Sequence, residues 1–198
     1  MLLKNLSAED AQAIANLHTK AFNSFFLTSL GNRFLKIFYQ TIINEPNGVA
    51  IGIFEEKQLV AFSIGTLKKR EFYSDILKKS AFLLFWAAVP QLIRHPKKIF
   101  RLIRSFGTKE TENKEILESA CLLSICVDPS MTNKGYGTKV LSAFEQKIFL
   151  KSKKISLTTD AEENDSVNYF YLQNKYILLC SFYQSNRKMN LYYKCYEN

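Results

Sequence analysis

Four consecutive residues, Lys134-Gly135-Tyr136-Gly137, have the clearest capacity for chemistry in this sequence. The chain has only seven glycines, and two of them stand here, between a strand-like segment and a helix-like segment. Glycines at such a junction let backbone N–H groups turn toward a phosphate, and the positive end of the helix dipole adds to the attraction. A GxG turn alone is as often a steric requirement as a binding site, so it predicts only an anion-friendly turn.

The sequence around this turn resembles motif A of the GNAT superfamily of N-acetyltransferases, Val-x-Pro-x-x-(Arg/Gln)-x-x-Gly-x-(Gly/Ala). Val127, Pro129, Gly135 and Gly137 match, and Thr132 stands where the family prefers Arg or Gln. The resemblance implies that acetyl-CoA binds here, with its pyrophosphate on the loop and its pantetheine arm on the preceding strand. The cofactor-binding residues are then Ile125, Cys126, Val127, Thr132, Asn133, Lys134, Gly135, Tyr136, Gly137 and Thr138.

A second segment, from Asn164 to Tyr176, resembles the family pattern Asn-x-x-Ala-x-x-Phe-Tyr-x-x-x-Gly-Phe. The spacing agrees throughout, with Val167 in place of Ala and Lys175 in place of Gly. Two motifs in the family's order are far more specific than either alone. The resemblance implies that Asn164 hydrogen-bonds the CoA arm and that Tyr171 is the general acid, because a phenol with a pKa of about 10 is protonated at neutral pH. The alternative for Tyr171 is a packing role in the core.

Acetylation of an amine also needs a proton acceptor, because an ammonium ion has no lone pair with which to attack a thioester. Histone-acetylating relatives carry a Glu at the position of Cys121, so that base is missing here. Glu118 and Asp160 are the first candidates for this catalytic role, and His18 is the third. Each is also common as a structural residue, so the sequence leaves the base open.

Hydrophobic periodicity predicts the elements that position these residues. Helical spacing indicates helices near 7–18, 25–42, 135–150 and 164–174. Strand-like runs cover 1–6, 49–54, 59–67, 116–127, 154–159, 177–183 and 189–196. We therefore expect an α+β fold over residues 1–198 as one acyltransferase domain, with one mixed, mostly antiparallel sheet of about seven strands flanked by helices, as the GNAT resemblance also implies.

A segment of about 45 residues, 71–115, separates the third and fourth predicted strands and reads as a helical insertion. We expect Pro90 and Pro96 to break it into segments. Apolar residues 82–86 are followed by a basic amphipathic helix over 94–104. This helix is expected to dock on the domain, where it would act as a lid, an interface or a peripheral membrane contact.

The formal net charge of +9 favours an anionic partner such as CoA or another phosphorylated molecule. The basic residues follow no nucleic-acid-binding pattern, and no ligand spacing predicts a metal site, so we expect neither partner. Four cysteines are expected to be buried and reduced: Cys121, Cys126, Cys180 and Cys195. The sequence shows no signal peptide and no apolar run near the ~20 residues of a membrane helix, which predicts a cytoplasmic monomer or homodimer.

The segment 24–31 resembles one found in bacterial GNAT proteins of surface-polysaccharide pathways, some of which acetylate amino sugars. Phe25 and Phe26 are accordingly predicted to bind the substrate. The leading prediction is transfer of acetyl from acetyl-CoA to a primary amine of a small molecule, with an amino sugar or nucleotide-linked amino sugar as a favoured acceptor. The alternatives are a protein or peptide N-acetyltransferase and a non-catalytic acyl-CoA-binding regulatory module.

Overall fold

The computed structural model describes residues 1–23, 25–94, 114–184 and 186–196. Its centre is a seven-stranded sheet in the order β1-β2-β3-β4-β5-β7-β6. All neighbouring strands are antiparallel except β4 and β5, so the predicted α+β fold with a mixed sheet is confirmed. The strands are β1 (Leu2–Asn5), β2 (Gly48–Glu55), β3 (Gln58–Thr66), β4 (Ala120–Val127), β5 (Lys154–Asp160), β6 (Ile177–Gln184) and β7 (Arg187–Cys195).

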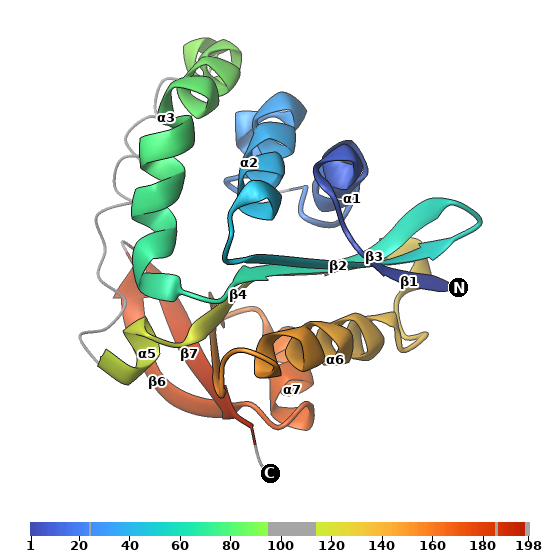
Figure 1. The fold of residues 1–198 in the computed structure, drawn as a ribbon, viewed down its shortest axis with the longest axis vertical. Helices are drawn as coiled ribbons and strands as arrows, with labels where there is room; N and C mark the ends of the chain where they lie inside the picture. Colours follow the sequence, from blue (N-terminus) through green and yellow to red (C-terminus); the bar gives the residue numbers. More distant parts are fainter. Residues whose placement is uncertain (24, 95–113, 185, 197–198) are drawn as a thin grey trace.

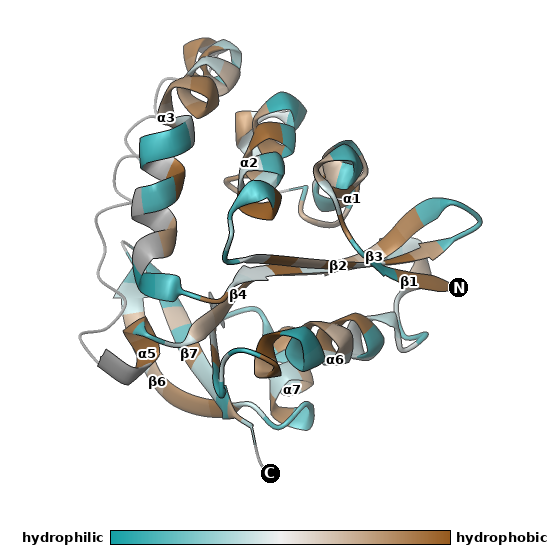
Figure 2. Ribbon diagram, in the orientation of Figure 1, coloured by the Kyte–Doolittle hydropathy of each residue, from teal (hydrophilic) through white to brown (hydrophobic). Residues whose placement is uncertain are grey.

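Helices cover both faces of the sheet (Figure 1). One face carries α1 (Ala11–Ala21), α2 (Asn32–Asn44) and α3 (Lys69–Arg94), and the other carries α6 (Tyr136–Phe149) and α7 (Asp165–Gln173). The short α5 (Lys114–Leu117) leads into β4. Two apolar clusters follow from this arrangement, one under α1, α2 and α3 and one under α6. The apolar residues of β2 and β3 lie between these layers (Figure 2).

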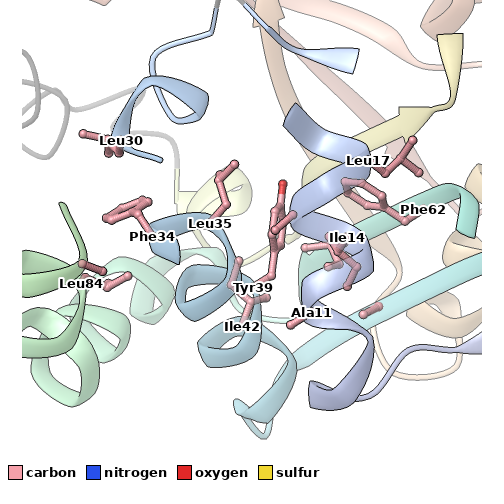
Figure 3. Close-up of a cluster of buried hydrophobic side chains, with 14 of the residues drawn as sticks. Ala11, Ile14, Leu17, Leu30, Phe34, Leu35, Tyr39, Ile42, Phe62 and Leu84 are labelled. Carbon is pink, nitrogen blue, oxygen red and sulfur yellow. The ribbon is translucent and has the colours of Figure 1, made fainter. Parts of the chain in front are cut away.

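The helix layer of α1, α2 and α3 is held by side chains at helical spacing. In α2, Phe34, Leu35, Tyr39 and Ile42 are buried, and they meet Ile14 and Leu17 of α1 in one cluster (Figure 3). Burial of side chains of this size contributes about 1.5–3 kcal/mol each. The helices are therefore fixed over the sheet by their apolar faces.

The helix predicted over 25–42 is shorter in the structure, because α2 begins at Asn32. Gly31 has φ +97°, a conformation that glycine adopts easily but that does not fit within an α-helix. The helix can therefore begin only after Gly31, which is the N-cap of α2. The preceding residues form a turn and the 3-10 helix η2 (Thr28–Leu30). Phe25 and Phe26 consequently lie on a loop between α1 and α2, rather than on a helix.

The prediction that Pro90 would break the insertion was wrong, since α3 continues through it to Arg94. Pro90 is exposed, while Ala87, Ala88 and Leu92 are buried on the inner side of the helix, so packing on both sides of the proline supports the helix there. Residues 95–113, with Pro96 and the predicted basic helix beyond position 94, lie outside the described residues. Among the residues that are described, no helix is long and apolar enough to cross a membrane.

The parallel strands β4 and β5 separate soon after they meet. They pair at Ala120 with Ile155 and at Cys121 with Ser156, and the ladder goes no further. The other edge of β4 stays paired with β3 as far as Val127, with a register shift at Ile64. The last six residues of β4 therefore face an open wedge beside β5.

The cysteine prediction is correct only in part. All four thiols are free, but Cys180 and Cys195 are exposed, and only Cys121 and Cys126 are buried. The difference arises because β6 is an edge strand whose residues are largely solvent-accessible, and Cys195 is the last residue of β7.

Candidate active site

A cavity of about 800 Å³ runs along the wedge between β4 and β5. Its two sides have different walls. We call the part formed by residues 131–133 and 135–138, the end of β5 at Thr158 and Thr159, Asn164 and the inner face of α7 the loop side. We call the part formed by α1, α2, α3 and the loop between α1 and α2 the helix side. The β4 residues Leu122 to Val127 line the cavity between them.

On the loop side, the chain changes direction through two left-handed residues. Asn133 has φ +60° and Gly135 has φ +79°, and Gly135 is the N-cap of α6. A Cβ at Gly135 would meet no atom within 4 Å, so the position requires glycine for its backbone conformation rather than for space. At Gly137 a Cβ would come within 3.4 Å of the Phe170 ring, an ordinary contact.

The first turn of α6 offers backbone N–H groups to this loop. Gly135 has no side chain with which to cap the helix, and the first amide that bonds back to it is that of Lys139 at 3.0 Å. The amides of Tyr136, Gly137 and Thr138 therefore have no helical acceptor, as at any helix start. Together with the helix dipole they form a site for an anion.

Asp128 anchors the start of the loop. Its carboxylate is buried and accepts hydrogen bonds from the Ser130 amide at 2.9 Å and the Lys20 Nζ at 2.7 Å. Burial alone raises the pKa of Asp128, but the bonds from Lys20 and Ser130 hold that pKa below its usual value. The ion pair ties the end of β4 to α1 and so connects the two sides of the cavity.

Of the ten residues predicted to bind the cofactor at this motif, nine line the cavity. The exception is Lys134, whose Nζ lies 3.3 Å from the Met131 sulfur on an exposed part of the loop. Ile125, Cys126 and Val127 line the wedge from β4. Burial raises the pKa of the Cys126 thiol to about 12, so it is protonated at neutral pH and offers no thiolate.

The second motif brings Asn164 and Tyr171 to the same cavity. The Asn164 Nδ2 donates to Thr159 Oγ1 at 2.9 Å and to the Asp160 carbonyl at 3.1 Å, which fixes the residue at the end of β5. Tyr171 is 5% exposed and its ring contacts those of Tyr176 and Tyr192. Burial raises the pKa of Tyr171 well above its usual value, so the hydroxyl carries its proton.

Neither carboxylate candidate for the base lies at the cavity. Glu118 is exposed in the turn before β4, at the end of that strand remote from the wedge, and is not part of the lining. Asp160 accepts from Arg187 Nε at 2.9 Å and is likewise absent from the lining. Their catalytic role stays a prediction that the geometry does not favour.

His18 is the candidate that the fold brings to the cavity. It is 4% exposed, lines the helix side, and its Nδ1 lies 2.7 Å from the Tyr39 hydroxyl. Tyr39 in turn donates to Ser124 Oγ of β4 at 3.3 Å. In the tautomer in which His18 Nδ1 donates to Tyr39 and Tyr39 donates to Ser124, Nε2 is left as an acceptor.

The His18 Nε2 is buried and has no hydrogen-bond partner among the described residues. Desolvation lowers the pKa of His18 to about 4, so the ring is neutral at pH 7. Buried polar atoms normally have a partner, and one without a partner beside a cavity marks a place for a ligand atom.

The sequence reasoning missed Tyr39 and Ser124. Tyr39 lies within the helix predicted over 25–42, and Ser124 within the strand-like run 116–127. The signal was the hydroxyl itself: Ser124 is the one hydroxyl-bearing residue in the run from Leu122 to Val127, and Tyr39 follows Phe38 in an apolar helix segment. Phe25 and Phe26, predicted to bind the substrate, do line the helix side.

Comparison with known proteins agrees with this geometry. Residues 111–174, which span β4, the glycine loop and α7, match the family described as Acetyltransferase (GNAT) family. No curated protein sequence matches the chain.

Solved structures share the fold over nearly the whole chain. Their sequence identities are low, so these similarities show the fold alone. A GNAT-family acetyltransferase from Bacillus cereus ATCC 10987 has a TM-score of 0.59 and 13% identity, covering 100% of this chain and 98% of that one. PaiA N-acetyltransferase from Thermoplasma acidophilum, in complex with coenzyme A, has a TM-score of 0.61 and 13% identity, covering 99% and 100%. The ribosomal-protein-S18-alanine N-acetyltransferase from Escherichia coli has a TM-score of 0.60 and 12% identity, covering 98% and 92%.

The GNAT family match thus covers both motifs, and the solved GNAT structures share the sheet on which this wedge lies. The family uses acetyl-CoA. The residues present fit that molecule, because the free amides at the start of α6 suit a pyrophosphate and the unpaired edge of β4 suits the amides of a pantetheine arm.

Proposed function

We propose that this protein transfers the acetyl group of acetyl-CoA to a primary amine of a small molecule. One observation carries the proposal: a single cavity joins the free amides of the glycine loop, the wedge beside β4, the protonated Tyr171 and the unpartnered His18 nitrogen. A donor thioester and an amine would meet where the two sides join.

In this proposal the loop and β4 hold the donor, and the described side chains handle the protons. As the new C–N bond forms, the amine loses a proton to His18 Nε2. As the C–S bond breaks, Tyr171 donates its proton to the departing sulfur. Exchange with solvent then restores neutral His18 and the Tyr171 phenol, so the net transfer is one proton from nitrogen to sulfur.

The Tyr39 hydroxyl and Ser124 act on the base in this scheme. Tyr39 accepts from His18 Nδ1, which sets the tautomer that leaves Nε2 free, and Ser124 accepts the Tyr39 proton. Both are positioning residues, because neither is required to touch the reacting atoms. The same arrangement supports His18 over Glu118 and Asp160 as the proton acceptor.

A small acceptor is favoured over an extended peptide because α3 contributes Phe72, Ile76 and Leu84 to the wall of the helix side. The insertion thus covers this side of the cavity through its described helix. A contact of the basic segment with a membrane, and the monomeric or homodimeric state, stay predictions.

The test measures release of free CoA thiol from acetyl-CoA with a panel of amines, amino sugars and peptides, alongside CoA binding by calorimetry. We expect at least one small amine to accelerate thiol release above the background hydrolysis. Tight CoA binding without acceleration by any acceptor would support the non-catalytic acyl-CoA-binding module instead. A peptide that outperforms every small amine would favour the protein N-acetyltransferase.

A further inference from the structure

The walls of the helix side are apolar to an extent that bears on the acceptor. Six phenylalanines line it, from four different parts of the chain: Phe22, Phe25, Phe26, Phe34, Phe38 and Phe72. They come from the end of α1 and the loop after it, from α2 and from α3.

The lining also lacks ionic side chains. Among the described residues that line the cavity, none is Asp, Glu, Lys or Arg. On the helix side, the polar atoms come from His18 and Tyr39, and Ser124 faces them from β4. The described lining residues therefore carry none of the chain's formal net charge of +9.

This composition disfavours polar acceptors. A buried hydroxyl without a hydrogen-bond partner is costly, and an amino sugar carries several hydroxyls against the three polar side chains that the described residues place here. A nucleotide-linked sugar would in addition bring phosphates to walls whose described residues include no cation. From the sequence, the net charge of the chain favours an anionic acceptor. The apolar lining of the cavity is the stronger argument, because it is what the acceptor contacts.

Building on the proposed function, we infer that the acceptor is an amine on an apolar body, such as an arylalkylamine or an alkylamine. Its ring or chain packs against the phenylalanines, and its nitrogen lies at His18 Nε2. Desolvation lowers the pKa of an ammonium group, so the apolar wall itself favours the neutral amine that can attack. The neutral His18 then receives the proton released as the C–N bond forms.

The test compares acceptors at fixed acetyl-CoA: 2-phenylethylamine and hexylamine against glucosamine and a nucleotide-linked amino sugar. We expect kcat/KM for the apolar amines to exceed that for the sugars by about 100-fold. Equal or faster acetylation of either sugar would overturn the inference and leave the acetyltransferase proposal intact. Failure of all amines to release thiol would instead remove the proposed function.

A second arm varies the donor, because the same walls would also suit a long acyl chain. Hexanoyl-CoA and octanoyl-CoA are compared with acetyl-CoA at a fixed small amine. We expect acetyl-CoA to be the better donor once an apolar amine fills the helix side. A longer acyl-CoA that outruns acetyl-CoA, and competes with the apolar amine, would assign the walls to the donor and overturn the inference.

A matched pair of variants tests the wall itself. Phe25 is 44% exposed and lines the cavity, whereas Phe82 is 73% exposed on α3 and does not. We expect Phe25→Ala to raise KM for 2-phenylethylamine about 10-fold with KM for acetyl-CoA unchanged, and Phe82→Ala to change neither. Equal effects of the two variants, or a Phe25→Ala effect on acetyl-CoA alone, would contradict the assignment.

Discussion

The loop side of the cavity presents main-chain N–H groups, hydroxyls and amides, whereas the helix side presents phenylalanine rings around one chain of three polar side chains. The first kind of surface recognises phosphate through backbone geometry and tolerates changes of side chain. The second recognises shape and polarity through the side chains themselves. One fold can therefore keep its donor and change its acceptor by replacing residues on α1, α2 and α3.

The largest expected effect comes from the point where the two sides meet. Tyr171→Phe removes the proposed proton donor and keeps the ring, so kcat should fall by about 100-fold or more, in the range for loss of a general acid. CoA affinity should be nearly unchanged, because the loop amides are untouched. Steady-state kinetics measures kcat, and calorimetry measures the affinity for CoA. An unaltered kcat would mean that Tyr171 has only a packing role.

Replacement of His18 should act on turnover from the helix side. His18→Gln keeps a polar side chain and loses the imidazole, and we expect kcat to fall by about 100-fold with KM for acetyl-CoA unchanged. Tyr39→Phe removes only the hydroxyl that sets the tautomer and should cost less, about 10-fold. If Tyr39→Phe lowered kcat as much as His18→Gln, this result would contradict the assignment of His18 as the proton acceptor and Tyr39 as its positioning residue.

The same histidine predicts how stability depends on pH. Its pKa is about 4 in the folded protein against 6.5 when unperturbed, so below pH 6.5 the unfolded chain takes up a proton that the folded chain does not. The free energy of unfolding should therefore fall as the pH falls from 6.5 to 4, by about 3 kcal/mol from this residue. Urea titrations of wild type and His18→Gln compare the slopes, and parallel curves in this window would contradict the predicted shift.

On the loop side, the two glycines form a matched pair. Gly135→Ala places a Cβ on a residue with φ +79° and should cost about 1 kcal/mol in stability and weaken CoA binding. Gly137→Ala meets only ordinary contacts, so unfolding of the free protein should be unchanged within about 0.5 kcal/mol. Thermal unfolding without ligand separates the two, and equal destabilisation would show that backbone strain is not what distinguishes them.

The smallest effect concerns Thr132, which departs from the family motif. Thr132→Arg adds a cation to an exposed loop beside the proposed pyrophosphate site, and we expect CoA affinity to rise about 3- to 5-fold at low salt. The gain should shrink in 0.5 M salt and be absent in Thr132→Gln, which adds length without charge. A salt-independent gain, or an equal gain from Gln, would mean that the pyrophosphate lies elsewhere.

Much of the fold could be read from the sequence because its signals are local. The hairpin of β2 and β3 and the amphipathic α6 follow from periodicity, and the loop of Gly135 and Gly137 follows from residue type. The start of α2 and the continuity of α3 were misjudged for the opposite reason. The positive φ of Gly31 delays the start of α2 to Asn32, and burial of Ala88 and Leu92 stabilises α3 on both sides of Pro90.

The sequence by itself determined the loop side: glycines that permit left-handed backbone, a helix start with unpaired amides, and Asn164 and Tyr171 at motif spacing. These properties belong to short segments and do not depend on what packs against them. Only the tertiary structure decided the helix side, because His18, Tyr39 and Ser124 are far apart in the chain and meet through the packing of α1 and α2 on β4. The tertiary structure also places Glu118 and Asp160 outside the cavity lining. A carboxylate can act as a base only where its oxygen reaches the substrate amine, and residue type alone does not determine that position.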